Sequence, residues 1–119
     1  MQSTDLGRFG PTTLNGITPV QICPAPASGF KREVVGIATT NLDTLSVTPI
    51  LQFDVSGTKT EIDRSPLLTP GATDKTMASV NNPHHLTGTT DSLYMKLAAA
   101  ITTNNPTVMV YFKETTDDA

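Results

Sequence analysis

The sequence predicts an all-β fold, a single-domain antiparallel β-sandwich of jelly-roll-like kind with an extended N-terminal arm. Short runs rich in β-branched and aromatic residues recur along the 119-residue chain, as expected for many short strands. Nine prolines and eight glycines separate these runs, and both residue types favour turns. Hydrophobic residues make up 37% of the chain and charged residues 16%, which is too apolar for a disordered chain. A chain of this length suits one domain with one core.

The first 17 residues are expected to form an arm outside the sandwich. Gly7, Gly10 and Pro11 interrupt the segment, and its apolar residues keep neither a helical nor a strand period. Those apolar residues include Leu6, Phe9 and Leu14. The arm is either a flexible terminus or an extended segment that lies on a neighbouring subunit. The second alternative would give the apolar side chains a surface to cover.

The sandwich domain is expected to span residues 18–113 and to begin with a short strand at Val20–Cys23. The strongest local pattern follows, in two strand-forming runs at Phe30–Thr40 and Leu45–Phe53. They are joined by the polar segment Asn41–Thr44, in which Asn and Asp tolerate turn conformations. The pattern predicts an antiparallel hairpin around which the rest of the chain is organised.

Two residues within these runs predict special positions. Gly36 has no side chain to pack, which indicates a bulge or the close approach of another backbone. Pro49 cannot donate a ladder hydrogen bond, which indicates a bulge or a sheet edge. Since sheet edges are where other chains can add a strand, Pro49 becomes a candidate for contact with another subunit.

Weaker strands are expected at Thr60–Ile62 and Lys75–Val80, on either side of a long connection. Pro70 and Gly71 in that connection predict a type II turn. The neighbouring leucines at 67 and 68 are expected to plug one end of the core.

The segment Ser92–Ile101 fits two patterns, because its leucines recur at helical spacing while its apolar residues also alternate as in a strand. We predict a strand. A short turn at residues 103–106 and a final strand at Thr107–Lys113 follow, and a turn this short should make the two strands antiparallel neighbours. Residues 114–119 are expected to form an acidic tail.

Charge, cysteine content and hydropathy exclude several classes of protein. The formal net charge is −3, and Lys31-Arg32 is the only basic pair that stands out, whereas a protein that grips nucleic acid needs a positive face. One cysteine cannot form an intramolecular disulfide. No run approaches the roughly 20 apolar residues of a membrane span, and no signal peptide is visible. We therefore expect no nucleic-acid partner, no membrane partner, and a chain that is made and kept, or assembled, in a cytoplasm.

Candidate groups for catalysis or metal binding are few. His84 and His85 are adjacent, so on a strand they point to opposite faces and do not readily bind one metal ion. Cys23 with His84 has the residue types of a nucleophile and its base, but a small buried thiol in an apolar strand is the favoured interpretation. We therefore expect no enzymatic activity, no cofactor and no metal site.

Several segments together resemble small β-sandwich structural proteins of tailed bacteriophages. The similar segments mostly encode strand and turn patterns and span about residues 18–113; they are Cys23–Ala27, Lys31–Ile37, Asn41–Thr44, Asp91–Leu93 and Val108–Lys113. The resemblance implies a virion protein without enzymatic activity. Its first candidate is a capsid decoration (cement) protein bound to the outside of the capsid.

On this resemblance, the expected partners are the major capsid protein and further copies of the chain, in a homotrimer on the capsid exterior. The expected contact residues are Leu6, Phe9, Leu14 and Pro49. Two alternatives stay open, a head-tail or tail component and a carbohydrate-binding adhesin module. An adhesin could stack sugars on aromatic residues, for which we instead expect core packing; they are Tyr94, Tyr111 and Phe112.

Overall fold

The structure, a computed structural model, describes residues 4–101 and 103–116, with side chains from residue 7 onward. These residues form β-strands joined by turns and loops, and none of them belongs to a helix that could cross a membrane. In chain order the strands are β1 (Thr4–Thr13), β2 (Val20–Cys23), β3 (Phe30–Thr40), β4 (Pro49–Val55), β5 (Thr58–Arg64), β6 (Thr73–Asp74), β7 (His84–Leu86), β8 (Asp91–Leu97) and β9 (Thr107–Thr116).

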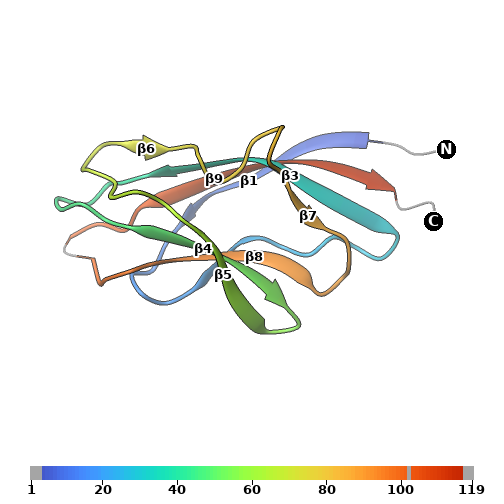
Figure 1. Ribbon diagram of the computed structural model, residues 1–119, viewed down its shortest axis with the longest axis horizontal. Helices are drawn as coiled ribbons and strands as arrows, with labels where there is room; N and C mark the ends of the chain where they lie inside the picture. The colour runs from blue at the N-terminus through green and yellow to red at the C-terminus, as the bar shows by residue number, and fades with distance from the viewer. Residues whose placement is uncertain (1–3, 102, 117–119) are drawn as a thin grey trace.

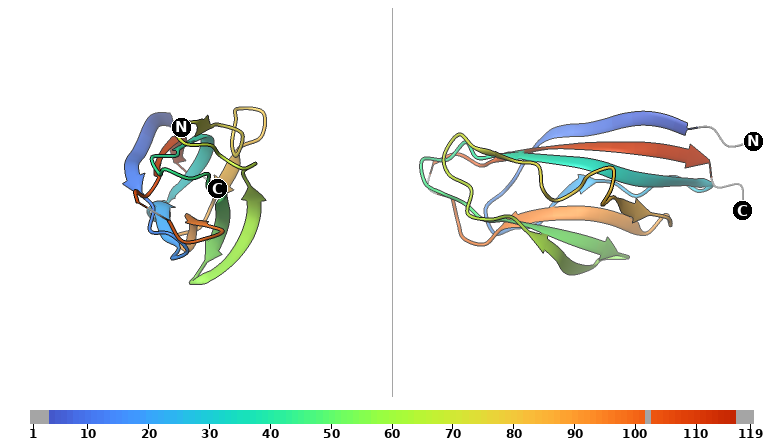
Figure 2. Two further views of the ribbon diagram at one scale, coloured as in Figure 1. Left: turned by 90° about the vertical axis from the view of Figure 1, so that its left-hand side faces the viewer. Right: turned by 45° about the horizontal axis from the view of Figure 1, so that its top comes forward.

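The strands form two antiparallel sheets that pack face to face (Figure 1). The five-stranded sheet has the order β1-β9-β3-β6, with β7 also paired to β3, and the four-stranded sheet has the order β2-β8-β4-β5. Figure 2 shows the two layers from the end and from a second side. When β6 and β7 are counted as one interrupted strand, this is the order of a jelly roll, a double sheet built from two Greek keys. The predicted all-β sandwich is confirmed.

The core lies between the sheets, and the alternation of side chains along each strand explains which residues enter it. On β9, Val108, Val110 and Phe112 are at most 9% exposed, while Met109 and Tyr111 between them are turned outward. The largest fully buried apolar side chains come from strands and loops of both layers; they include Leu14, Ile22, Leu51, Met77, Leu86, Leu93, Met95 and Leu97.

The predicted hairpin between Phe30–Thr40 and Leu45–Phe53 is wrong. β3 lies in the five-stranded sheet and β4 in the four-stranded sheet, so residues 41–48 cross between the layers. The hairpin is instead β4–β5, whose turn has positive φ at Ser56 (52°) and Gly57 (95°), the conformation that matches strand twist. Alternating residues and a polar connection look alike in a hairpin and in a crossover, so the pattern predicts strands without predicting their partners.

The C-terminal third differs from the prediction in the same way. The strand predicted at Ser92–Ile101 is confirmed as β8 up to Leu97, and residues 98–101 are instead a loop. β8 and β9 belong to different sheets, so the expectation that they are neighbours is wrong. The expected strand at Lys75–Val80 is also wrong, because β6 ends at Asp74 and the chain continues as a loop to β7. The jelly-roll strand is therefore interrupted at this point.

The N-terminal segment is extended, as predicted, but it is an edge strand of the sandwich. β1 pairs with β9 from Thr4 opposite Thr115 to Thr13 opposite Thr107, and residues 114–116 accordingly belong to β9. Residues 1–3 of the expected arm and residues 117–119 of the expected acidic tail lie outside the described residues. That the N-terminal segment also lies on a neighbouring subunit stays a prediction.

Two local predictions are confirmed. The pairing of β3 with β9 shifts register between Val34 and Gly36, which is a bulge, and a Cβ atom on Gly36 would lie 3.2 Å from the Tyr111 ring. Gly71 has a φ of +80°, and the Ala72 N–H donates to the Thr69 carbonyl at 3.0 Å. This is the geometry of a type II turn.

Four crossovers between the sheets meet at one end of the molecule, away from the two chain ends (Figure 1). They are residues 14–19, 41–48 and 65–72, and residues 98–101 with 103–106, and we call this the loop end. The fully buried Asn41 joins two of these crossovers. Its side-chain amide donates to the Leu45 and Leu68 carbonyls, both at 2.9 Å, and its side-chain oxygen accepts from the Asp43 N–H at 2.8 Å. A buried side chain with three hydrogen bonds fixes how the chain changes layers.

Asn41→Ala should lower the free energy of unfolding by about 2–4 kcal/mol, because the substitution removes three hydrogen bonds and leaves the Leu45 and Leu68 carbonyls without their partner. Urea denaturation measures the loss. Asn82→Ala, which truncates an exposed asparagine in another loop, is the control and should change stability by less than about 0.5 kcal/mol. Equal losses for the two variants would show that Asn41 does not hold the crossovers.

Candidate interaction surfaces

The predicted contact residues Leu6 and Phe9 lie on β1, the strand at one edge of the five-stranded sheet. The Leu6 side chain is outside the described part of the structure. Phe9 is half-buried and stacks on Phe112 with 4.9 Å between ring centroids and 14° between ring planes. Phe9 therefore already has an apolar partner within this chain, and only its outer part offers a surface to another molecule.

The other two predicted contact residues are buried. Leu14 is 1% exposed and belongs to the hydrophobic core. Pro49 is buried at the start of β4, which lies between β8 and β5, so the expectation that Pro49 marks a sheet edge is wrong. A proline is tolerated as the first residue of a strand, and its carbonyl still accepts from the Ser65 N–H at 2.9 Å.

Arg32 on β3 is a structural residue that the sequence analysis missed. Its Nε donates to Glu114 Oε1 at 2.7 Å, and its Nη1 donates to the Pro24 and Ala25 carbonyls at 2.7 and 3.2 Å. Its guanidinium carbon also lies 5.0 and 5.2 Å from the centroids of the Phe9 and Phe112 rings, within the range of a cation–π contact. One side chain thus ties β1, β3, β9 and the loop after β2 together.

Cys23 and the two histidines form no reactive pair. Cys23 is fully buried, and burial raises the pKa of its thiol to about 11, although the nearby Arg32 guanidinium acts in the opposite direction. His84 Nε2 donates to the Met77 carbonyl at 2.6 Å, so its ring is held by the chain's own backbone. Within residues 4–101 and 103–116, no three His, Cys, Asp or Glu side chains lie together in a way that could hold a metal ion. The buried-thiol interpretation of Cys23 agrees with this geometry.

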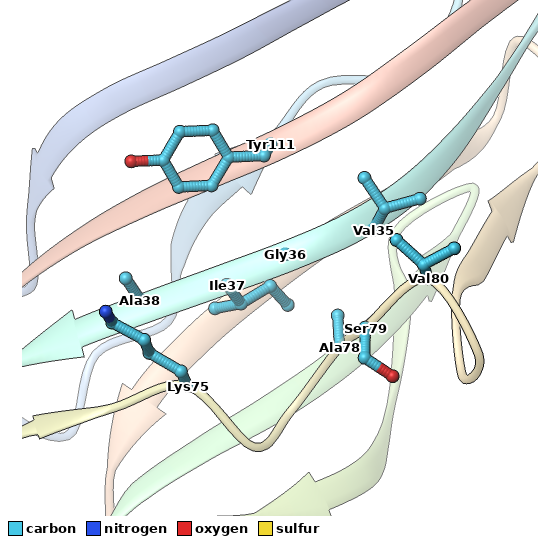
Figure 3. Close-up of a pocket in the computed structure, with 9 residues that line it drawn as sticks. All are labelled: Val35, Gly36, Ile37, Ala38, Lys75, Ala78, Ser79, Val80 and Tyr111. Carbon is cyan, nitrogen blue, oxygen red and sulfur yellow. The ribbon is translucent and has the colours of Figure 1, made fainter.

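A shallow apolar hollow of about 340 Å³ lies on the outer face of the five-stranded sheet. Its floor is Val35–Ala38 of β3, one wall is Tyr111 of β9, and the other wall is the loop residues Ala78–Val80 with Lys75 at one end (Figure 3). Val80 is 66% exposed and Tyr111 is 44% exposed. The hollow therefore presents apolar side chains to solvent, with an amine and two hydroxyl groups as its polar groups.

The hollow depends on the bulge in β3. Because Gly36 lacks a side chain, the Tyr111 ring can lie close against the strand. Figure 3 shows Tyr111 beside the strand, with Val35 and Val80 together at the end of the hollow away from Lys75. The expectation that Tyr111 packs in the core is wrong, whereas Phe112 beside it is buried.

The outer face of the four-stranded sheet carries a group of polar side chains around Asp54. Asp54 is 6% exposed, lies 3.4 Å from Lys59 Nζ and accepts from Ser92 Oγ at 3.4 Å. Lys59 Nζ in turn lies 4.3 Å from the centroid of the Tyr94 ring. Tyr94 and Tyr111 thus lie on different sheets, and Phe112 is in the core, so the three aromatic residues form no shared stacking platform.

The fold and surfaces described above define a jelly-roll β-sandwich with an apolar hollow on one sheet. No protein-family model matches the sequence, and no curated protein matches it. Among solved structures, the chain is similar to the virus-like particle of the extra small virus of the giant freshwater prawn Macrobrachium rosenbergii. The TM-score is 0.49 and the sequence identity is 8%, over 100% of this chain and 80% of that chain. It is also similar to the capsid asymmetric unit of cyanophage Pam1, with a TM-score of 0.38 and 16% identity over 98% of this chain and 84% of that chain.

Arg32→Met should lower the free energy of unfolding by about 2–3 kcal/mol, because methionine keeps an apolar stem but loses the charge-assisted hydrogen bonds and leaves Glu114 unpaired. Chemical denaturation measures the loss. Arg8→Met is the matched control, since Arg8 is exposed on β1 and should cost little. If both variants unfold at the same denaturant concentration, Arg32 does not tie the strands together.

The pKa of Cys23 predicts a loss of stability at high pH. The folded chain holds the thiol protonated up to about pH 11, whereas an unfolded chain ionises it near its ordinary value of 9.0. Stability should therefore be unaffected by this group below pH 9 and should fall as the pH rises from 9 through about 11. In Cys23→Ala the dependence of unfolding free energy on pH should be flatter in this window. Parallel curves for the two proteins would contradict the assigned burial of the thiol.

Proposed function

We propose that this protein is a non-enzymatic virion structural protein, and specifically a capsid decoration (cement) protein that binds the outside of a shell of major capsid protein and stabilises it. The observation that carries the proposal is the strand order, β1-β9-β3-β6/β7 over β2-β8-β4-β5. Jelly rolls with two Greek keys occur in viral capsid domains, lectins and cupins. Since a fold alone does not give a function, the surface has to distinguish among these classes.

The exposed surface supports a role in protein–protein contact. A sugar or small-molecule site has polar groups that converge on the ligand, whereas the hollow beside Tyr111 is lined mainly by aliphatic and small side chains. Exposed apolar patches of this kind are typical of contact surfaces between proteins. The resemblance of the sequence to structural proteins of tailed bacteriophages points the same way, and it implies the capsid exterior and self-association as a homotrimer.

Two features of the five-stranded sheet, its open edge and its hollow, suit a repeated contact on a capsid shell. The open edge of β1 can accept a strand from a neighbour, because its outward backbone groups have no strand beside them in the described sheet. The hollow, with Val80 and Tyr111 on its walls, can accept an apolar side chain of the shell protein. Of the predicted contact residues, we assign Leu6 and Phe9 to this edge, because both belong to β1. Leu14 and Pro49 are buried within this chain. Many weak contacts on one particle add to a strong attachment.

Particles that lack the protein should release their packaged DNA at a lower temperature than complete particles, because each bound copy adds buried area between shell subunits. DNA release is followed by dye fluorescence during heating. Purified protein added back to deficient particles should restore the higher temperature. Equal release temperatures with and without the protein would remove the cement role.

A pair of variants tests whether the hollow is the contact surface. Val80→Asp places a charge in the hollow and should weaken binding to deficient particles at least tenfold, whereas Ile62→Asp on the exposed strand β5 should bind as the unmodified protein does. Co-sedimentation with particles measures both. Antibody labelling of particles adds the location, and a label confined to tails would contradict attachment to the capsid exterior.

A further inference from the structure

The loop end carries the densest group of exposed large apolar side chains among the described residues. Each of its members projects from a crossover loop and is at least half exposed; they are Ile17 (59%), Leu42 (50%), Leu45 (59%) and Leu67 (68%). Leu68, next to Leu67, is only 7% exposed, so the predicted core plug is confirmed for one leucine and wrong for the other. Most of the Leu67 side chain therefore faces solvent.

Hydrogen bonds between the crossovers hold these side chains on a rigid scaffold. Val47 and Leu68 exchange two backbone bonds of 3.0 and 2.7 Å. The Leu14 N–H donates to the Pro106 carbonyl at 2.9 Å, and the Ala98 N–H donates to the Thr48 carbonyl at 3.0 Å. All four crossovers are thus linked, and a surface that is ordered before binding loses little entropy on binding.

The loop end presents no exposed charge among the described residues. Asp43 is the only charged residue in the four crossovers, and it is 5% exposed. Its Oδ1 accepts from the backbone N–H groups of Thr44, Thr103 and Asn104. A charged partner such as nucleic acid would therefore find nothing to pair with. The crossovers also have none of the Lys, Arg, Trp or Tyr residues that are typical of surfaces bound to membranes.

The same end carries both protruding side chains and a recess. A hollow of about 270 Å³ lies between the second crossover and the last, lined by apolar residues together with Ser46, Thr48 and the largely buried Asp43. The apolar lining residues are Leu45, Val47, Leu67 and Ala98–Ala100. An uncharged apolar surface needs an uncharged apolar partner, and the loop end of a second copy meets that requirement. When the same surface of two copies meets in this way, the contact has two-fold symmetry.

We propose that copies of this chain meet end to end through their loop ends, with Leu42, Leu45 and Leu67 of one copy packed against the same end of another. The molecule measures 49 × 25 × 20 Å, so its end offers roughly 500 Å² per copy, near the lower limit of a specific interface. The contact is therefore weak in solution, with a Kd of about 10 μM to 1 mM. It does not depend on the proposed function, although copies held on one particle would strengthen it.

Sedimentation equilibrium of the full chain, at concentrations up to about 1 mM, tests the proposal without any particle. The unmodified chain should form dimers with rising concentration, and the double variant Leu45→Ser/Leu67→Ser should associate at least tenfold more weakly. The matched control is Val55→Ser/Ile62→Ser, which removes two similarly exposed apolar side chains (46% and 41%) from β4 and β5 and should dimerise unchanged. Circular dichroism checks that all three proteins are folded.

Two results would overturn the proposal. One is a chain that stays monomeric throughout the series, and the other is equal association of the two double variants. If the chain is monomeric and only the loop-end variant loses binding to particles, the shell protein occupies this end, which contradicts contact between copies. Dimerisation in solution would stand even if the protein had no effect on particle stability, so the two proposals can fail separately.

Discussion

Burial of one face of each sheet against the other is the constraint on which the structure depends. Neither sheet could remain exposed on its apolar face, so the chain must supply strands to both layers, and it does so by crossing between them four times at the loop end. Each crossover takes backbone polar groups out of a ladder, and those groups must be paired elsewhere. Asn41 and Asp43 supply part of that pairing. These two buried polar side chains therefore satisfy backbone groups in the crossovers that join the two sheets around the apolar core.

The sequence predicted the strands much better than their partners. Alternation placed Val20–Cys23 and Phe30–Thr40 almost without error, and the lack of a side chain at Gly36 predicted the bulge. Pairing could not be predicted, because the polar segment after Thr40 satisfies the rules for a tight turn and equally those for a crossover between sheets. The N-terminal segment was missed as a strand since Gly7 and Gly10 weaken the alternation, although Gly7 is what allows the Phe112 ring to pack beside it.

The surfaces were harder to predict than the core, for a physical reason. Leu14 and Leu67 are both leucines in loop segments, yet one is 1% and the other 68% exposed, and only the three-dimensional position of each loop separates them. Arg32 was visible merely as half of a basic pair, because its partners Glu114 and Phe9 come from opposite ends of the chain. Residues that act through distant neighbours leave no local pattern. The apolar hollow and the loop end therefore emerge only from the folded chain.

The molecule has three surfaces of different character. The outer face of the five-stranded sheet has an apolar hollow, and the outer face of the four-stranded sheet carries polar side chains around Asp54. The loop end has exposed leucines and no exposed charge among the described residues. This difference between the two faces suits a protein that binds a shell through one sheet and exposes the other sheet to solvent. The most direct measurement is an electron cryomicroscopy map of particles that contain the protein. We expect density for the jelly roll on the outside of the capsid shell, seated through the five-stranded sheet. A map in which this density lies in the tail, or in which the hollow beside Tyr111 faces solvent, would contradict it.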